Sequence, residues 1–226
     1  MTKLIFAFMQ AYGGDERESL LLARSLRTFG GELANHPLWM MMPQNLEQVS
    51  ETTFQALSKL DVQLHRFEVP EEALKFPFGG KVYAAAVAES LASNEADILV
   101  WMDSDTIFVD EPAGLVPGDT VELGYRPVML KNISSLYDEH QENILYRIFI
   151  HQAILAGTIL ASLKKDKMHD LGTRFNYPVF LEGTLEPAND VVTLRYDGFD
   201  FFQQPCWEDK APSKGTVKEW LCAQVR

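Results

Sequence analysis

The pair of carboxylates in Asp103-Ser104-Asp105 is the part of the sequence best suited to chemistry. It directly follows Ile98–Met102, in which every residue is apolar, as in a buried strand. Two converging carboxylates repel each other, and a divalent cation removes that repulsion. Mg²⁺ and Mn²⁺ prefer oxygen ligands and often share them between carboxylates and substrate phosphates. The pattern predicts a site for a metal ion and a diphosphate, although Asp-Ser-Asp also favours a simple solvated turn.

Alternating strand-like and helix-like segments must position these carboxylates. The expected strands are Leu4–Met9, Leu38–Met42, Val62–Val69 and Ile98–Met102. Helices are expected to start at Asp15 with Glu18 as a capping pattern, at Asn45 with Gln48, and after Gly79-Gly80 over Lys81–Ala92. This order of elements predicts an α/β fold with a mostly parallel central sheet flanked by helices. Ligands of such sheets bind beyond the carboxyl ends of the strands, where Asp103 and Asp105 lie.

The second half of the chain is less regular. We expect strands at Val121–Met129 and Val191–Tyr196, a mostly helical stretch at Leu136–Lys164 and a short helix at Val217–Ala223. A length of 226 residues is compatible with one domain. We therefore predict a single domain over residues 1–226, with a nucleotide-binding half at 1–110 and an acceptor half with a C-terminal tail at 111–226.

Composition excludes several classes of protein. The chain has 32 acidic and 20 basic residues, a formal net charge of −12, which argues against nucleic-acid binding. Its two cysteines, Cys206 and Cys222, do not make a disulfide scaffold and favour a reducing compartment. The most apolar long stretch, Ile144–Leu163, contains Arg147 and His151, so no membrane span is expected. The expected location is the cytoplasm.

At this point the chain resembles the nucleotide-sugar-dependent glycosyltransferases of the GT-A fold, whose hallmark is a DxD motif after an apolar strand. The likeness extends over approximately residues 1–200. It implies a GT-A-like domain that moves a sugar from a UDP- or GDP-linked donor to a carbohydrate or other hydroxyl acceptor. It also implies that Asp103 and Asp105 hold Mn²⁺ or Mg²⁺, which binds the donor diphosphate.

Four further residues are candidates for binding the substrates. Phe78–Ala86 resembles the family's helix upstream of the motif, whose basic residue faces the donor, and Lys81 would lie in its first turn. Tyr12 follows the first expected strand, where this architecture receives the nucleotide base. Gln152 and Asn176 lie in segments that resemble a later region of some members, and their amides could bind a sugar. A surface lysine and a packing tyrosine are the alternatives for Lys81 and Tyr12.

One position departs from the family pattern. Many members place a third metal ligand, a histidine, in a late strand, and the comparable position here holds Arg195. Arginine cannot bind a cation, but it can pair with a diphosphate. Three explanations stay open: a metal with fewer protein ligands, Arg195 in place of part of its charge, or a chain without catalytic competence. Asp197, two residues later, could be the missing ligand.

An inverting transferase needs a carboxylate base that deprotonates the acceptor hydroxyl. Asp138, Glu139 and Glu142 lie in a polar stretch before the expected long helix and are the candidate catalytic bases. A solvated helix start is the alternative for these three residues.

Other classes of protein fit the motif less well. Asp103-Ser104-Asp105-Thr106 also resembles the first motif of haloacid-dehalogenase-type phosphatases, in which the first aspartate attacks phosphorus and Mg²⁺ neutralises the phosphate. That motif normally follows the first strand of its fold, whereas three expected strands precede it here. A second alternative is a non-catalytic binding module that keeps the GT-A fold. A dinucleotide-binding enzyme is disfavoured because Ala11-Tyr12-Gly13-Gly14 is not a G-x-G-x-x-G turn.

Overall fold

The computed structural model describes residues 2–10, 14–44, 49–75, 78–118, 120–126, 155–179, 190–205, 207–210 and 216–225. The chain forms two compact units, one of Met1–Ala113 with Thr173–Arg226 and the other of Gly114–Gly172. The predicted boundary at residue 110 between a donor half and an acceptor half stays a prediction.

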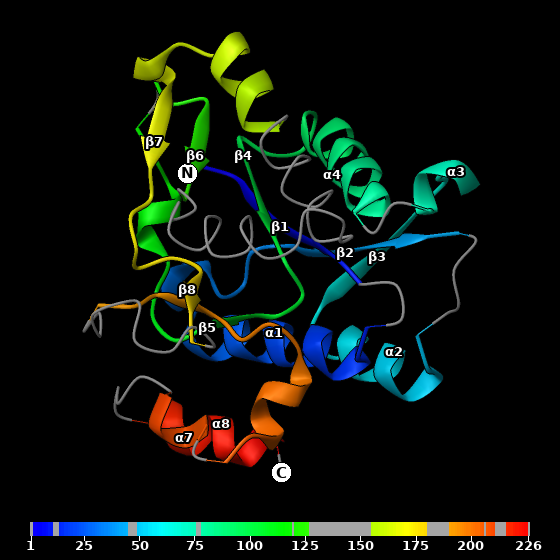
Figure 1. Ribbon diagram of the computed structural model, residues 1–226, viewed down its shortest axis with the longest axis vertical. Coiled ribbons are helices and arrows are strands. Elements are labelled where there is room, and N and C mark those ends of the chain that lie inside the picture. Colours follow the sequence, from blue (N-terminus) through cyan, green and yellow to red (C-terminus); the bar gives the residue numbers. More distant parts are fainter. Residues whose placement is uncertain are drawn as a thin grey trace, which may run out of the picture. The chain divides into compact units, whose positions relative to one another are not determined.

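A four-stranded parallel sheet is the centre of the first unit (Figure 1). Its strands are β1 (Leu4–Met9), β2 (Leu38–Pro43), β3 (Val62–Phe67) and β4 (Ile98–Met102), in the order β3-β2-β1-β4. Every neighbouring pair is parallel. All four strands were predicted from the sequence, with bounds that differ by at most two residues at one end, and the parallel sheet is confirmed.

Helices cover both faces of this sheet, which explains why its inner strands are apolar at every position. They are α1 (Glu16–Phe29), α2 (Glu51–Ser58), α3 (Glu71–Leu74) and α4 (Gly79–Ala92). Figure 1 shows α4 on one side of β1 and β2, with α1 and α2 on the other. Ile5, Ala7 and Met9 of β1 belong to one buried cluster with Ala84 and Ala88 of α4. The predicted α/β fold with a parallel central sheet flanked by helices is therefore confirmed.

The predicted start of the second helix at Asn45 is wrong, because residues 49 and 50 are not helical and α2 begins at Glu51. Ser50 is the N-cap, and its Oγ accepts a hydrogen bond from the Thr53 N–H at 3.3 Å. Glu16 of α1 in turn accepts hydrogen bonds from the Ser50 N–H at 2.7 Å and the Ser50 hydroxyl at 2.6 Å. Ser50, and not the predicted Asn45, is therefore the residue that caps the helix, and its contact with Glu16 joins the start of α2 to α1.

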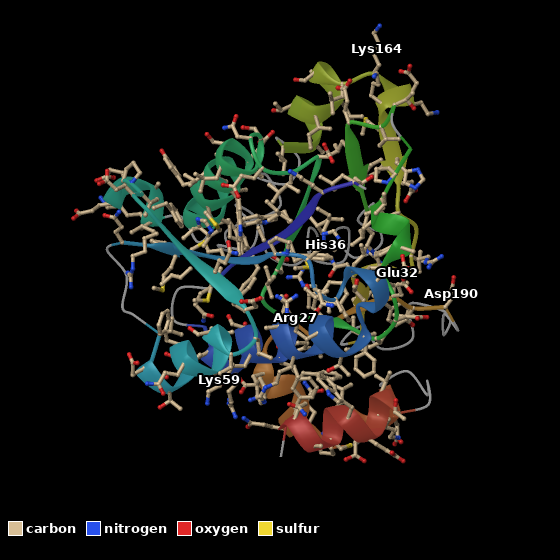
Figure 2. The ribbon with its side chains drawn as sticks, turned by 180° about the vertical axis from the view of Figure 1, so that it is seen from behind. Arg27, Glu32, His36, Lys59, Lys164 and Asp190 are labelled. Atoms are coloured by element: carbon tan, nitrogen blue, oxygen red, sulfur yellow. The ribbon has the colours of Figure 1, made fainter. Side chains whose placement is uncertain are left out.

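Arg27, near the end of α1, joins that helix to the loops that lead into β2 and β3 (Figure 2). Its guanidinium donates to the carbonyl of Leu60 at 2.9 Å, to that of His36 at 3.0 Å, and to that of Ala34. A planar guanidinium has several donors in a fixed geometry and can satisfy several carbonyls at once. The position of α1 against the sheet is thereby defined.

A second, three-stranded sheet brings a late part of the chain to the end of β4. Its strands are β5 (Thr106–Phe108), β9 (Thr193–Arg195) and β8 (Tyr177–Pro178), in the order β5-β9-β8. β5 and β9 are antiparallel, and β8 and β9 are parallel. β9 confirms the strand predicted at Val191–Tyr196, in shorter form. The Phe108 N–H donates to Ser25 Oγ of α1 at 3.0 Å, which ties this sheet to the helix.

The C-terminal elements pack with α1 and β9 around a second buried cluster that includes Leu21, Tyr196 and Leu221. They are the 3₁₀ helix Phe199–Gln203, α7 (Trp207–Lys210) and α8 (Val217–Val225), and the short helix predicted at Val217–Ala223 is confirmed. Shorter 3₁₀ helices occur at Gly31–Leu33, Ala113–Leu115 and Lys165–Lys167.

The second unit contains the parallel pair β6 (Leu123–Tyr125) and β7 (Met168–Asp170). β6 lies within the strand predicted at Val121–Met129, and residues 155–162 are helical, as predicted for the end of Leu136–Lys164. Residues 127–154 lie outside the described residues. In the parts of the chain that the structure describes, we find no helix with the length and apolar character required to cross a membrane.

Candidate functional site

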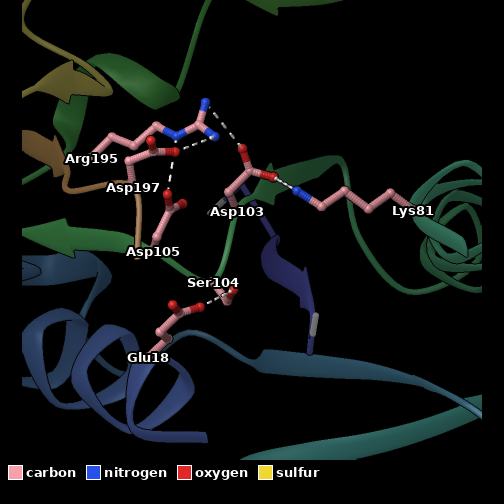
Figure 3. A network of polar contacts seen from close by, with 7 residues as sticks. All are labelled: Glu18, Lys81, Asp103, Ser104, Asp105, Arg195 and Asp197. Atoms are coloured by element: carbon pink, nitrogen blue, oxygen red, sulfur yellow. Dashed lines mark hydrogen bonds and ion pairs between the residues drawn. The ribbon is translucent and has the colours of Figure 1, made fainter. Parts of the chain in front are cut away.

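Five charged side chains gather beyond the carboxyl end of β4 and define the charged cluster. They are Lys81, Asp103, Asp105, Arg195 and Asp197 (Figure 3). The order β3-β2-β1-β4 reverses direction at β1, so that β1 and β4 are neighbours although β2 and β3 lie between them in sequence. In open α/β sheets, ligands bind outside the carboxyl ends of the strands at such a reversal. The topology and the charges thus indicate the same place.

Asp103 is held between two cations. Its Oδ1 lies 2.6 Å from Lys81 Nζ, and its Oδ2 lies 3.6 Å from Arg195 Nη1. Burial by itself raises the pKa of Asp103, but the charges of Lys81 and Arg195 outweigh burial, and the pKa lies below its ordinary value. Asp103 is therefore a carboxylate at neutral pH.

Lys81 reaches Asp103 because α4 begins very close to the preceding helix. A Cβ on Gly79 would lie 1.8 Å from the Ala73 carbonyl oxygen, so only glycine fits at the first position of α4. Lys81 is two residues further on, in the first turn, where free backbone N–H groups favour anions. The Gly79-Gly80 pair thus starts the helix so that Lys81 lies in its first turn, as predicted, and the side chain pairs with Asp103.

Arg195 is brought to Asp105 by strand pairing. Thr106 of β5 lies opposite Arg195 of β9, and the Tyr196 N–H donates to the Asp105 carbonyl at 3.3 Å. Arg195 Nε donates to Asp105 Oδ2 at 3.1 Å. Burial lowers the pKa of Arg195, but Asp105 and Asp103 outweigh that effect and raise the pKa above its ordinary value. The guanidinium is therefore a permanent positive charge that bridges the two aspartates.

Asp105 has one carboxylate oxygen in use and one without a partner. Its side chain is 11% exposed, and its Oδ1 is buried with no hydrogen-bond partner among the described residues. A buried polar atom without a partner is costly and needs an explanation, such as an ion or ligand that belongs there. A carboxylate oxygen only accepts hydrogen bonds or binds a cation. A cation or a hydrogen-bond donor from a ligand would satisfy this oxygen.

Asp197 lies at the edge of the cluster. Its Oδ1 is 4.0 Å from Arg195 Nη2, and its side chain is 60% exposed. Its φ of 60° is in the left-handed region, which aspartate tolerates better than most residues. Burial raises the pKa of Asp197, with Arg195 acting in the opposite direction. Asp197 contacts the far side of the guanidinium, and its role as a third metal ligand stays a prediction.

Glu18 and Ser104 are the part of the site that the sequence did not indicate. Ser104 Oγ, from the residue between the two aspartates, donates to Glu18 Oε2 at 2.9 Å. We predicted Glu18 only as part of a capping pattern with Asp15. Asp15 is indeed the N-cap of α1, but its side chain accepts from the Arg17 N–H, and the Glu18 carboxylate turns toward Ser104 (Figure 3). A buried serine within Asp-x-Asp is the one signal that could have suggested an anchor on that side.

The remaining predicted residues contact other parts of the chain or lie outside the described residues. Asn176 also has a left-handed φ, of 50°, and its N–H donates to Thr193 Oγ1 at 2.7 Å, beside β9. The other predicted residues fall in segments that the structure does not describe: Tyr12, Asp138, Glu139, Glu142 and Gln152. The structure thus brings together Lys81, Asp103, Asp105 and Arg195 from the predicted set.

The charged cluster fits a divalent cation only in part. Among the described residues, no group of three or more His, Cys, Asp or Glu side chains is arranged as a metal site. Mg²⁺ and Mn²⁺ are nevertheless often held by one or two carboxylates together with phosphate oxygens of the substrate. Asp103 and Asp105 provide that donor set, and the unpaired Asp105 Oδ1 is a ready ligand atom. The residues fit a metal that shares its ligands with a diphosphate.

Comparisons with known proteins place the chain in a family. Residues 6–145 match the Rhodobacterales glycosyltransferase domain, which is more than half of the chain. No curated protein sequence shows a significant match.

Two solved structures resemble the fold over nearly its full length. One is an active-site mutant of LgtC, at 13% identity and a TM-score of 0.48, and the other is the galactosyltransferase LgtC in complex with donor and acceptor sugar analogues, at 12% and 0.49. Each comparison covers 98% of this chain and 95% of the other.

The predicted glycosyltransferase is confirmed at the level of the family, and the phosphatase alternative loses its support. By its match over residues 6–145, this chain belongs to the Rhodobacterales glycosyltransferase domain family.

Proposed function

We propose that this glycosyltransferase moves a sugar from a UDP- or GDP-linked donor to a carbohydrate or other hydroxyl acceptor, with Mn²⁺ or Mg²⁺ on Asp103 and Asp105. The observation that carries the proposal is the convergence of these two carboxylates with Lys81 and Arg195 beyond the end of β4. Carboxylates would hold the metal, and cations would bind the diphosphate. Both kinds of group are needed where a nucleoside diphosphate leaves with its negative charge.

The cations are at present paired with the aspartates, and a diphosphate would compete for them. Phosphate oxygens accept charge-assisted hydrogen bonds from lysine and arginine at least as well as a carboxylate does. When Lys81 and Arg195 donate to the diphosphate, the oxygens of Asp103 and Asp105 become available. A bound metal would supply Lewis-acid stabilisation of the leaving group. In this scheme, Lys81 and Arg195 stabilise the same developing charge from the sides of α4 and β9.

The acceptor side of the proposal rests on sequence alone. Asp138, Glu139 and Glu142 are proposed as candidate bases that deprotonate the acceptor hydroxyl. Gln152 and Asn176 are proposed to bind a sugar through their amides, and Tyr12 to stack on the nucleotide base. Alanine substitution of each, with initial rates measured against both substrates, separates a base from a binding residue.

The first experiment is a thermal-shift panel of UDP, GDP and CDP, each with and without Mn²⁺. A ligand at about 100 times its dissociation constant stabilises by about 2.7 kcal/mol, a shift of roughly 5–10 °C for a chain of this size. We expect a shift that requires both one nucleotide and the metal. Asp105→Asn should abolish it, whereas Asp166→Asn, an exposed aspartate in the second unit, should leave it intact.

A second assay, which measures release of sugar from a nucleotide sugar, tests turnover. With the nucleotide sugar that matches the preferred base, a transferase often releases its sugar slowly to water when the metal is present. Binding without release would support the non-catalytic module instead. No shift with any nucleotide in the presence of Mn²⁺ would contradict the proposed site.

A further inference from the structure

Glu18 is a buried carboxylate that pairs with no positive side chain among the residues that the structure describes. The residue is 7% exposed and lies in the first turn of α1. Burial raises the pKa of Glu18, and the negative charges of Asp105 and Asp15 add to that effect. Burying a carboxylate without a cation beside it costs free energy of folding unless hydrogen bonds compensate. Its partners therefore indicate what it does.

One partner is the middle of the Asp-Ser-Asp segment. The Ser104 hydroxyl donates to Glu18 Oε2 at 2.9 Å, and Ser104 is itself 6% exposed. Figure 3 shows Ser104 turned toward Glu18 on α1, while Asp103 and Asp105 turn toward Arg195 on the opposite side. Anchoring the middle residue on one side directs the two aspartates to the other.

The other partner is the turn that follows Arg195. Glu18 Oε1 lies beside this turn, 3.9 Å from the place that a Cβ on Gly198 would take, and the Phe199 backbone acts to lower the pKa of Glu18 against the effect of burial. This turn contains Asp197, with φ 60°, and Gly198, with φ 105°, a conformation that suits only glycine. A sharp turn of this kind needs fixed contacts to persist. Glu18 is thus hydrogen-bonded to one of the two chain segments that carry the charged cluster and lies against the other.

The helix that carries Glu18, α1, is tightly packed against its surroundings. Its neighbour Arg17 lies over the Phe199 ring, with 3.9 Å from Cζ to the ring centroid. Further along α1, Ser25 accepts from the Phe108 N–H, and Leu22 and Leu26 are fully buried. A carboxylate on so well packed a helix can hold two chain segments at a defined separation.

We infer that Glu18 is a positioning residue that fixes the distance between the Asp103–Asp105 pair and Arg195. The inference rests on the proposed function, because the pair and the arginine are the groups proposed to hold the metal and the diphosphate. Glu18 itself contacts neither. Glu18 keeps the Asp103–Asp105 pair and Arg195 in place before the donor binds, which reduces the free-energy cost of binding.

The test compares four single variants, Glu18→Ala, Glu18→Gln, Ser104→Ala and Ser25→Ala, and the double variant of Glu18→Ala with Ser104→Ala. The readouts are the Kd of the preferred nucleoside diphosphate with Mn²⁺, measured by calorimetry, and the Tm. Ser25→Ala is the matched control, since it removes a buried hydrogen bond between the same helix and β5 at a distance from the charged cluster.

We expect Glu18→Ala to weaken nucleotide binding about 10- to 100-fold, as for the loss of hydrogen bonds to a charged group. Glu18→Gln keeps an accepting oxygen for Ser104 and should bind within about 3-fold of the wild type. Ser104→Ala should weaken binding, and the double variant should bind no more weakly than Glu18→Ala, since the contact with Ser104 is already lost there. Ser25→Ala should lower the Tm and leave the Kd unchanged.

Several results would overturn the inference. Wild-type affinity in Glu18→Ala would do so, and so would a loss in Ser25→Ala as large as that in Glu18→Ala, which would indicate a general effect of stability. If Glu18→Ala does not fold, the other two variants decide. Weak nucleotide binding by Glu18→Gln together with wild-type binding by Ser104→Ala would then reject the inference. A wild-type protein that binds no nucleoside diphosphate with Mn²⁺ would instead refute the proposed function, and the inference with it.

Discussion

Arg195 lies opposite Thr106 in the antiparallel pair of β5 and β9, and this register places its guanidinium beside the preceding residue, Asp105. Arg195 Nε is 3.1 Å from Asp105 Oδ2, and Nη1 is 3.6 Å from Asp103 Oδ2. A single strand pairing thus puts a positive charge between two carboxylates that would otherwise repel each other. The arginine occupies the place where the GT-A resemblance led us to look for a histidine ligand.

Replacing Arg195 should separate the binding of metal from that of nucleotide. Arg195→Met leaves the two carboxylates without this cation, so Mn²⁺ alone should stabilise the variant in a thermal-shift assay but not the wild type. Affinity for the nucleoside diphosphate in the presence of Mn²⁺ should fall about 10- to 100-fold, the usual loss for a charge-assisted contact. A variant that ignores free Mn²⁺ and binds nucleotide as tightly as the wild type would contradict the assignment of Arg195.

Lys81 should matter for the donor and little for the fold. Lys81→Met removes one of the two cations on Asp103, and we expect the Kd of the nucleoside diphosphate to rise about 10-fold in calorimetry. Lys75→Met is the control, because Lys75 forms an ion pair with Glu72 in which both side chains are exposed, by 70% and 81%. Equal Kd values for the two variants would exclude Lys81 from the site.

Gly79 should be intolerant of any side chain. A Cβ there would lie 1.8 Å from the backbone oxygen of Ala73, so Gly79→Ala must shift the start of α4. We expect a loss of about 1–3 kcal/mol in the free energy of unfolding. Gly118→Ala, where no atom lies within 4 Å of the added Cβ, should change it by less than about 0.5 kcal/mol. Chemical denaturation of both variants measures the difference, and equal midpoints would contradict the close approach.

The buried carboxylate of Glu18 predicts a dependence of stability on pH. Burial, with the nearby charges of Asp105 and Asp15, raises its pKa in the folded protein, and the buried Tyr196 hydroxyl lies close as well. An acid with a raised folded pKa favours folding while it is protonated in both states. That contribution is lost as the pH rises from the ordinary pKa of a glutamate toward the folded value.

Glu18→Gln does not titrate and provides the comparison. The Tm of this variant minus that of the wild type should increase between pH 4 and pH 7, since only the wild type loses stability through Glu18. Thermal unfolding of both proteins at intervals of one pH unit measures it. A difference that stays constant with pH would show that Glu18 has an ordinary pKa.

The first four strands were predictable because the cause of their pattern is local. β1 and β2 are covered on both faces, so every residue of Leu4–Met9 and Leu38–Met42 is apolar and buried. β5 and β8 were not predicted, because strands of three and two residues are too short for any periodicity. They exist through pairing with β9, a contact between distant parts of the chain that no local pattern reveals.

The candidate site divides in the same way. Asp103, Asp105 and Lys81 could be chosen from residue type and from their positions after a strand and at a helix start, and Arg195 through the resemblance to the GT-A family. Glu18 could not, since a glutamate three residues after Asp15 has a sufficient local explanation in helix capping. Its contact with Ser104 spans 86 residues of sequence. The charged residues of the site could be predicted, but the contact between Glu18 and Ser104 that supports them could not.

The pairing of β5 with β9 also has a consequence for biosynthesis. Asp105 and Arg195 are 90 residues apart in the chain, so the ribosome synthesises both aspartates and Lys81 well before the strand that carries the arginine. At typical rates of elongation the interval is roughly 5–20 s. During that time the parallel sheet can form, but the edge of β5 and the carboxylate of Asp105 have no partner. A nascent chain that stalls before β9 would therefore expose an unpaired strand and a cluster of negative charge, both of which chaperones or proteases can detect.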